Sequence, residues 1–270
     1  VKSFISKGTM TTLNCPEEYL LAKKLIKLHP WAGMVKFARS GGEANAIAIR
    51  IARAASGRDN IAICGYHGWH DWYLSVNLKS KNNLNKHLLP GLKIDGVPKS
   101  LRNNVHAFEL NDFEKLKKIY SKYKIGTLIL EIARNNLPDK KFLKKIKKFC
   151  KQKKIILIFD ECTSGFRRNI GGMHLLTNIN PDIVMLGKAI GNGYAITSVI
   201  GDKKIMKKAE NSFISSTMWS ERVGFVAALA SINEMEKVKS YKILINRGQY
   251  LNKKWSELSK KHNLNLSING

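Results

Sequence analysis

Two apolar stretches that end beside chemically active side chains constrain the fold most strongly. Residues Ile155 to Phe159 form an uninterrupted apolar run that stops at Asp160 and Glu161. A run without polar alternation predicts a buried parallel strand. A second apolar stretch, Ile183 to Leu186, is followed by one glycine and then by Lys188. Because ligands of open α/β sheets bind at the carboxyl ends of the strands, we expect a carboxylate and an amine at one edge of a sheet.

Strand-like and helix-like patterns alternate along most of the chain. The expected strands are 34–37, 61–64, 105–108, 126–130, 155–159, 183–186 and 196–200, and the expected helices are 13–28, 45–55, 112–123, 140–151, 203–209, 221–235 and 243–258. This alternation predicts an α/β fold with a mainly parallel sheet sandwiched by helices. The segment 79–101 is rich in Asn, Lys, Gly and Pro, so we expect a long surface excursion there.

The charge balance makes nucleic acid a partner to consider. The chain has 270 residues, with 47 Lys and Arg against 20 Asp and Glu, and a formal net charge of +27. The lysines are dispersed over helical faces, as in 140–151, which favours solvated faces and makes nucleic-acid binding the weaker alternative. We find neither a membrane-spanning apolar segment nor a signal sequence, and therefore expect a cytoplasmic protein without a membrane partner.

Neither the cysteines nor the histidines indicate a metal site. The four cysteines show no CxxC or CxxH pairing and are expected to be packing residues in a reducing compartment; they are Cys15, Cys64, Cys150 and Cys162. The group of His67, His70 and Asp71 has a spacing that suits no common zinc pattern. We therefore expect no metal.

A glycine-rich turn between an expected strand and an expected helix suits an anion. Ser40, Gly41 and Gly42 occupy this turn. Glycine permits close backbone approach, and the unpaired N–H groups and dipole of a helix start favour phosphate. The same residues are also typical of ordinary helix capping. At another expected strand end, Tyr66 is a candidate to stack on a flat ring, with packing inside its own loop as the alternative.

The carboxylate and the amine together indicate a kind of cofactor. A buried carboxylate can hold a protonated ring nitrogen, and a lysine in a desolvated pocket can form a Schiff base with an aldehyde. These are the protein's contributions to pyridoxal phosphate chemistry, so Asp160 and Lys188 are the candidate catalytic residues. The alternatives are a surface lysine beside a turn and a carboxylate that caps a helix or joins an ion pair.

Five motifs in order make the chain resemble the class III aminotransferases among the fold-type I pyridoxal-phosphate enzymes. Within that family it is most similar to the glutamate-1-semialdehyde 2,1-aminomutase group. The motifs are SGGEA at 40–44, YHG at 66–68, Glu131 with Asn136, DECTSGFR at 160–167 and GKAIGNGY at 187–194. Each motif alone is weak, but the ordered set is specific and covers nearly the whole chain.

The resemblance implies a role for each motif. Lys188 forms the Schiff base with pyridoxal 5'-phosphate, and Asp160 pairs with the pyridine nitrogen. The other implied cofactor-binding residues are Ser40, Gly41, Gly42, Tyr66, His67, Glu131, Asn136 and Thr217. Thr217 stands where the family's threonine reaches the phosphate of the neighbouring subunit, which implies a homodimer with shared sites.

The resemblance also implies an activity and a domain division. The expected activity moves an amino group between an amino compound and a carbonyl acceptor, and the alternative is the intramolecular transfer of an aminomutase. A reading of another class is a catalytically idle relative, or a basic protein that binds nucleic acid or a partner. Residues 1–236 are expected to be a large cofactor-binding domain, slightly truncated at its N-terminal side. Residues 237–270 are expected to be a linker helix and the start of an incomplete small domain.

Overall fold

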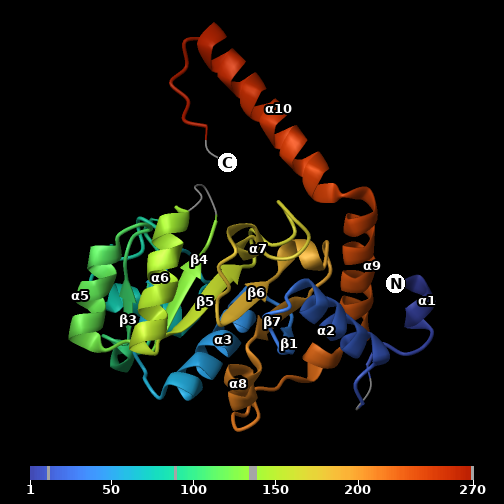
Figure 1. Ribbon diagram of the computed structural model, residues 1–270, viewed down its shortest axis with the longest axis horizontal. Helices are drawn as coiled ribbons and strands as arrows, with labels where there is room; N and C mark the ends of the chain where they lie inside the picture. Colours follow the sequence, from blue (N-terminus) through green and yellow to red (C-terminus); the bar gives the residue numbers. More distant parts are fainter. Residues whose placement is uncertain (11–12, 88–89, 134–138, 269–270) are drawn as a thin grey trace.

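A computed structural model describes residues 1–10, 13–87, 90–133 and 139–268, and Figure 1 shows one sheet flanked by helices. The strands are β1 (Met34–Ala38), β2 (Ile61–Cys64), β3 (Val105–Ala107), β4 (Thr127–Glu131), β5 (Ile156–Glu161), β6 (Ile183–Leu186) and β7 (Thr197–Gly201). The longer helices are α2 (Pro16–Leu28), α3 (Gly41–Ser56), α5 (Phe113–Tyr123), α6 (Lys140–Lys153), α9 (Arg222–Val238) and α10 (Ser240–Lys261).

Short helical segments complete the described chain. The four-residue α-helices are α1 (Lys2–Ile5), α4 (Asp71–Leu74), α7 (His174–Thr177) and α8 (Lys203–Met206). The 3₁₀ turns are η1 (Ser75–Leu78), η2 (Lys99–Leu101), η3 (Lys188–Ile190), η4 (Lys207–Ala209) and η5 (Thr217–Ser220).

The sheet is mixed and mainly parallel, as the sequence predicts. Its order is β1-β7-β6-β5-β4-β2-β3, and among the described strands β7 alone runs opposite to the other six. The direction of β7 has a simple cause: the connection 187–196 is too short for the helical crossover that a parallel neighbour requires. The other strands therefore share one direction, and their carboxyl ends lie at one edge of the sheet.

Alternate residues of the central strands pack on opposite faces. Leu157 and Phe159 join the core that α2, α5, α6 and α9 cover, whereas Ile158 joins the core beneath α3. Both faces are therefore buried, which explains the absence of polar alternation in β5. The same period places Asp160 on the α3 face and Glu161 on the α2 face.

Helix α3 begins earlier than the predicted helix 45–55, at Gly41, because a capping box organises its first turn. The Ser40 hydroxyl accepts a hydrogen bond from the Glu43 N–H, and the Glu43 carboxylate accepts one from the Ser40 N–H. These bonds satisfy donors that a helix start leaves unpaired. The glycine turn is thus already part of the helix.

The described residues of 79–101 are mostly exposed and irregular, as the composition predicts, but two apolar side chains anchor the segment. Leu84 is fully buried and Val97 nearly so. The side-chain oxygen of Asn77 accepts the Leu84 N–H at 3.1 Å, and Nδ1 of His87 accepts the Gly65 N–H at 3.0 Å. Scattered apolar residues and side-chain acceptors therefore anchor this irregular segment to the end of β2.

Helix α10 projects away from the sheet and its covering helices (Figure 1) and has no buried residue. It follows α9 through Lys239, which adopts a left-handed conformation at φ 51°. Within the ranges that the structure describes, no helix combines the length and the hydropathy needed to cross a membrane.

Candidate cofactor site

Four sequence motifs meet at the carboxyl edge of the sheet. A Cβ atom added to Gly68 would lie 3.2 Å from the Cα atom of Gly42, so the YHG and SGG turns are in contact. A Cβ atom on Gly41 or Gly187 would lie 3.6 or 3.3 Å from the sulfur of Cys162. The turns that follow β1, β2, β5 and β6 therefore enclose one small region.

Asp160 is a buried carboxylate with three hydrogen-bond donors. Its Oδ2 atom lies 2.9 Å from Nδ1 of His67 and 2.9 Å from Nδ2 of Asn45, and its Oδ1 atom accepts the Cys162 N–H at 3.1 Å. Burial alone raises the pKa of this carboxyl group, but the His67 contact and the other two donors outweigh burial and hold the pKa below its usual value. Asp160 is therefore ionised at neutral pH.

His67 acts on Asp160 directly. Because an ionised carboxylate only accepts hydrogen bonds, Nδ1 of His67 carries the proton. The ring is fully buried and stacks on Trp72, with the ring centroids 6.4 Å apart and the planes at 21°. Its Nε2 atom has no hydrogen-bond partner among the described residues. Asn45 also leaves its Oδ1 atom unpaired there. Sequence reasoning missed Asn45, although it directly follows the SGGEA motif.

Glu131 and the Tyr66 turn are locked together at the ends of β4 and β2. The Glu131 Oε2 atom accepts the Tyr66 N–H at 3.1 Å. Gly65 has φ 115°, and a Cβ atom there would lie 2.4 Å from Cβ of Glu131, so only glycine fits. The Tyr66 ring is half-buried and meets Tyr73 edge-on at 5.9 Å.

The SGG turn leaves backbone donors available at the start of α3. In the part of the chain that the structure describes, the N–H groups of Gly41 and Gly42 have no acceptor. The Ser40 hydroxyl is engaged in the capping box. A Cβ atom on Gly42 would lie 2.5 Å from the His70 ring, so His70 packs directly against the turn. This backbone is suited to an anion.

Lys188 lies at the end of β6 with an exposed side chain. Its backbone adopts φ 46°, and its Nζ atom donates to Oγ1 of Thr163 at 2.8 Å. The carbonyl oxygen of Thr163 accepts from Nε of Arg167, also at 2.8 Å. Thr163 therefore joins the candidate amine to a guanidinium group, and neither Thr163 nor Arg167 was assigned a role from the sequence.

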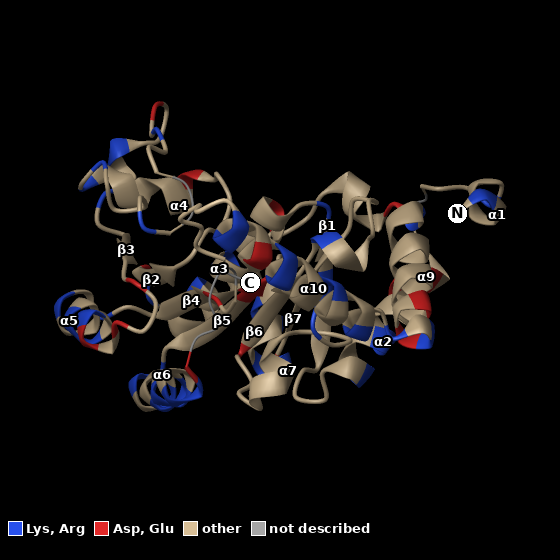
Figure 2. Cartoon of the chain, turned by 90° about the horizontal axis from the view of Figure 1, so that it is seen from above, with Lys and Arg blue, Asp and Glu red and all other residues tan. Residues whose placement is uncertain are grey.

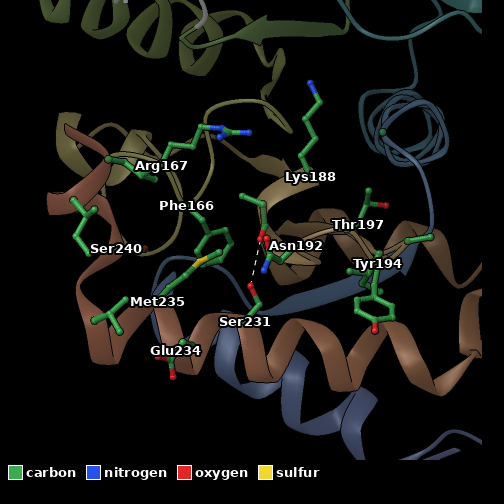
Figure 3. A pocket seen from close by; sticks show the side chains of 18 of the residues that line it. Phe166, Arg167, Lys188, Asn192, Tyr194, Thr197, Ser231, Glu234, Met235 and Ser240 are labelled. Carbon is green, nitrogen blue, oxygen red and sulfur yellow. Dashed lines mark hydrogen bonds between the residues drawn. The ribbon is translucent and has the colours of Figure 1, made fainter. Parts of the chain in front are cut away.

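A cavity of about 810 Å³ opens beside Lys188. It extends from Gly41 and Arg167 to the C-terminal part of α9 and the first turns of α10. Figure 3 shows Lys188 and Arg167 on one side of this cavity and Ser231 and Glu234 on the other. The cavity is large enough for a small molecule.

Glu161 fixes the loop that carries Arg167. Its carboxylate accepts the N–H groups of Met173 and His174, and Nδ1 of His174 lies 2.7 Å away. Nε2 of His174 accepts the Trp31 indole N–H at 3.0 Å, which assigns the proton of the neutral ring to Nδ1. The sequence places Glu161 beside Asp160, but only the structure shows that it serves the opposite face.

The structure does not bring every predicted residue into this region. Thr217 lies in η5 with an exposed side chain and does not line the cavity. Asn136 lies outside the described residues. Among the described residues, no group of three or more His, Cys, Asp or Glu side chains is placed to hold a metal ion.

Known proteins resemble the chain in both sequence and fold. It is 33% identical to a 3-aminobutyryl-CoA aminotransferase of Cloacimonas acidaminovorans over 90% of this chain and 57% of that protein. It is also 33% identical to a glutamate-1-semialdehyde 2,1-aminomutase of Sulfolobus acidocaldarius over 88% of this chain and 58% of that protein. The chain therefore spans less than two thirds of the length of these relatives.

A solved structure of a transaminase with PLP bound has the same fold. It superposes with a TM-score of 0.89 at 23% identity, over 100% of this chain and 65% of that one. The fold-type I architecture expected from the sequence is thereby confirmed. The family model for aminotransferase class III matches residues 2–270, which confirms the resemblance that the five motifs carry. The chain belongs to the class III aminotransferase family.

Proposed function

We propose that this chain carries the cofactor site of a pyridoxal-phosphate-dependent class III aminotransferase. The observation that supports this most directly is the convergence of an amine, Lys188, with a buried ionised carboxylate, Asp160, at the ends of neighbouring strands. The available N–H groups of Gly41 and Gly42 suit the phosphate. The residues present therefore fit this cofactor in its three distinctive parts: aldehyde, ring nitrogen and phosphate.

The proposed division of labour follows from the contacts. When bound, pyridoxal phosphate supplies an aldehyde that takes up amino groups and a ring that accepts electrons. Asp160 holds a proton on the ring nitrogen, and His67 and Asn45 keep that carboxylate ionised and oriented. Lys188 Nζ would hold the cofactor at its aldehyde carbon and, as the free amine, would move the proton at the substrate carbon.

The remaining predicted contacts have narrower roles in this proposal. Tyr66 covers one face of the cofactor ring, in a turn that Glu131 holds through the Tyr66 N–H. Ser40 acts through the capping box that shapes the phosphate turn, because its hydroxyl is already engaged there. Asn136 remains a candidate from the family resemblance alone.

An aminomutase is the second candidate activity. It is favoured by the 33% identity to the Sulfolobus acidocaldarius aminomutase, which equals the identity to the aminotransferase. Incubation with a single amino-aldehyde, with and without a keto-acid acceptor, separates the two reactions. A transaminase requires the acceptor, whereas an aminomutase turns over without it.

We further propose a homodimer in which Thr217 reaches the neighbouring cofactor. Thr217 is exposed, and the large apolar side chains near it are exposed as well, Phe213 to 89% and Met218 to 60%. Such side chains are typical of a surface that a partner covers. Light scattering should give the mass of a dimer, and Thr217→Ala should weaken cofactor retention. Unchanged affinity in that variant would refute the shared contact.

We also propose that the chain divides into two parts near residue 236. Residues 1–236 contain the sheet, its covering helices and the candidate site. Residues 237–270 include α10, which buries no residue and projects from the body, as expected of a linker helix that leads to a small domain. The last turn of α9 reaches Val238, so the helix crosses the proposed boundary by two residues.

The colour of the purified protein tests the proposed cofactor site. Reconstitution with pyridoxal phosphate should give visible absorbance, and borohydride should fix the cofactor to the peptide that contains Lys188. Lys188→Ala should lose both signals, whereas Lys204→Ala, at an exposed lysine of α8, should retain them. Asp160→Ala should keep the attachment but lose most of its turnover. A protein that stays colourless after reconstitution would instead support an idle relative that binds a partner.

A further inference from the structure

A second cavity lies at the opposite end of the sheet from α2, beside the edge strand β3. Its volume is about 300 Å³, and it is bounded by β3, α5 and the residue that follows η1. The side chains that matter for its chemistry are Lys79, Lys115, Lys118, Lys122, His106 and Tyr123. None of them belongs to the candidate cofactor site.

The cavity concentrates positive charge that no carboxylate balances. Lys115, Lys118 and Lys122 follow a spacing of three and four residues, which places them on one face of α5. Among the described residues, no Asp or Glu lines the cavity and none of the cavity lysines forms an ion pair. Lys117, which does not line the cavity, instead pairs with Glu114 at 2.7 Å. Figure 2 shows the blue of Lys and Arg on α5 and on the loop that leads to β3.

The stacked rings of Tyr123 and His106 lie beside two of the cavity lysines. The centroids of the Tyr123 and His106 rings lie 3.7 Å apart, and the angle between the ring planes is 17°. Lys79 Nζ donates to the Tyr123 hydroxyl at 2.7 Å, and the ammonium groups of Lys79 and Lys122 lie 5.2 and 5.3 Å from the centre of the Tyr123 ring. Tyr123 therefore orients two lysines toward one space.

The titration of both rings reflects the same positive field. The hydrogen bond from Lys79 lowers the pKa of the Tyr123 phenol. Burial, together with the charges of Lys79 and Lys122, lowers the pKa of His106 to about 4, so this ring is neutral at pH 7. The positive charge of the cavity thus comes from its lysines.

We propose that this cavity binds a small anion that carries two or more phosphate groups. Lysine is a compact point charge that binds phosphate well, whereas planar recognition of a carboxylate favours arginine, and none of the described residues that line the cavity is an arginine. Four ammonium groups match the charge of a di- or triphosphate better than that of a single phosphate. The volume of about 300 Å³ favours a small molecule over an extended nucleic acid.

Calorimetric titration of the whole chain with inorganic phosphate, pyrophosphate and triphosphate at 0.1 M salt tests this site. The test variant is Lys118→Gln with Lys122→Gln. The matched control is Lys23→Gln with Lys27→Gln, because these lysines have the same spacing on α2, are also exposed, and lie at the other end of the sheet (Figures 1 and 2). Each pair removes the same charge, and circular dichroism verifies that each variant is folded.

We expect one triphosphate per chain, with affinity that rises along the phosphate series. The Lys118/Lys122 pair should lose at least about tenfold in affinity, and the control should stay within about twofold, since charges beyond the Debye length of about 10 Å are screened. Equal losses in both variants, or binding of long nucleic acid without binding of triphosphate, would overturn the proposal. ATP as a further ligand shows whether an esterified phosphate chain is accepted as well as the free one.

Discussion

Replacing His67 by phenylalanine tests how the buried carboxylate at the candidate site is kept ionised. The substitution keeps a ring beside Trp72 but removes the donor that lies 2.9 Å from Asp160. Two donors remain, from Asn45 and from the Cys162 backbone. A hydrogen bond to a charged group contributes about 1.5–3 kcal/mol, and an entirely unpartnered buried charge costs about 3–5 kcal/mol. Because the carboxylate keeps two donors, we expect a coupling energy of about 2 kcal/mol.

A double-mutant cycle isolates this coupling from the packing change. Urea unfolding of the wild type, His67→Phe, Asp160→Asn and the double variant gives the four free energies of unfolding. In the double variant the buried group carries no charge, so removal of the His67 donor should cost about 2 kcal/mol less than it does in the wild type. A coupling energy below about 0.5 kcal/mol would refute the contact as the cause of the ionised state.

The pH dependence provides an independent check with a defined sign. In the wild type the folded-state pKa of Asp160 is lowered, so its stabilisation is present above the unfolded pKa and is lost as the pH falls through the folded value. Removing His67 removes the largest lowering contribution, while burial continues to raise the pKa. As the pH falls through the unfolded pKa, the free energy of unfolding of His67→Phe relative to the double variant should therefore fall less than that of the wild type relative to Asp160→Asn. Parallel pH profiles would contradict this account.

Three further predictions concern the backbone, the core and the thiols. Gly65→Ala should lower the free energy of unfolding by at least about 2 kcal/mol, because backbone strain at φ 115° adds to the overlap of the new Cβ atom with Glu131. The control Gly57→Ala, at φ 65° with open space around it, should lower it by about 1 kcal/mol. Similar losses in the two variants would refute the overlap. Phe159→Ala, in the buried core, should cost about 3–5 kcal/mol in urea unfolding, and Tyr19→Ala, at a 67% exposed side chain of α2, less than about 0.5 kcal/mol. Burial raises the pKa of Cys64 to about 12 and also raises those of Cys150 and Cys162, so an aromatic disulfide reagent at pH 8 should modify these thiols only after denaturation. Rapid modification of the folded Cys15→Ser variant would contradict their burial.

Much of the fold follows from the sequence because the governing signals are local. The unbroken apolar run in β5 requires burial on both faces, and the alternation of strands with helices requires a mainly parallel sheet. The strand ends then place Asp160, Lys188 and Tyr66 at one edge without further information. The ordered motifs identified the family, which the match over residues 2–270 confirms.

Only the tertiary structure determines how those residues are supported. Asn45 and His67 are far from Asp160 in the sequence, and their contacts depend on how α3 and the β2 turn pack against β5. The antiparallel direction of β7 and the burial of Leu84 within an irregular segment likewise depend on long-range packing. Local patterns set which segments form and where reactive groups emerge, because periodicity and turn chemistry act over a few residues. The hydrogen-bond partners and charged neighbours of a side chain come from distant segments, so only the folded chain determines them.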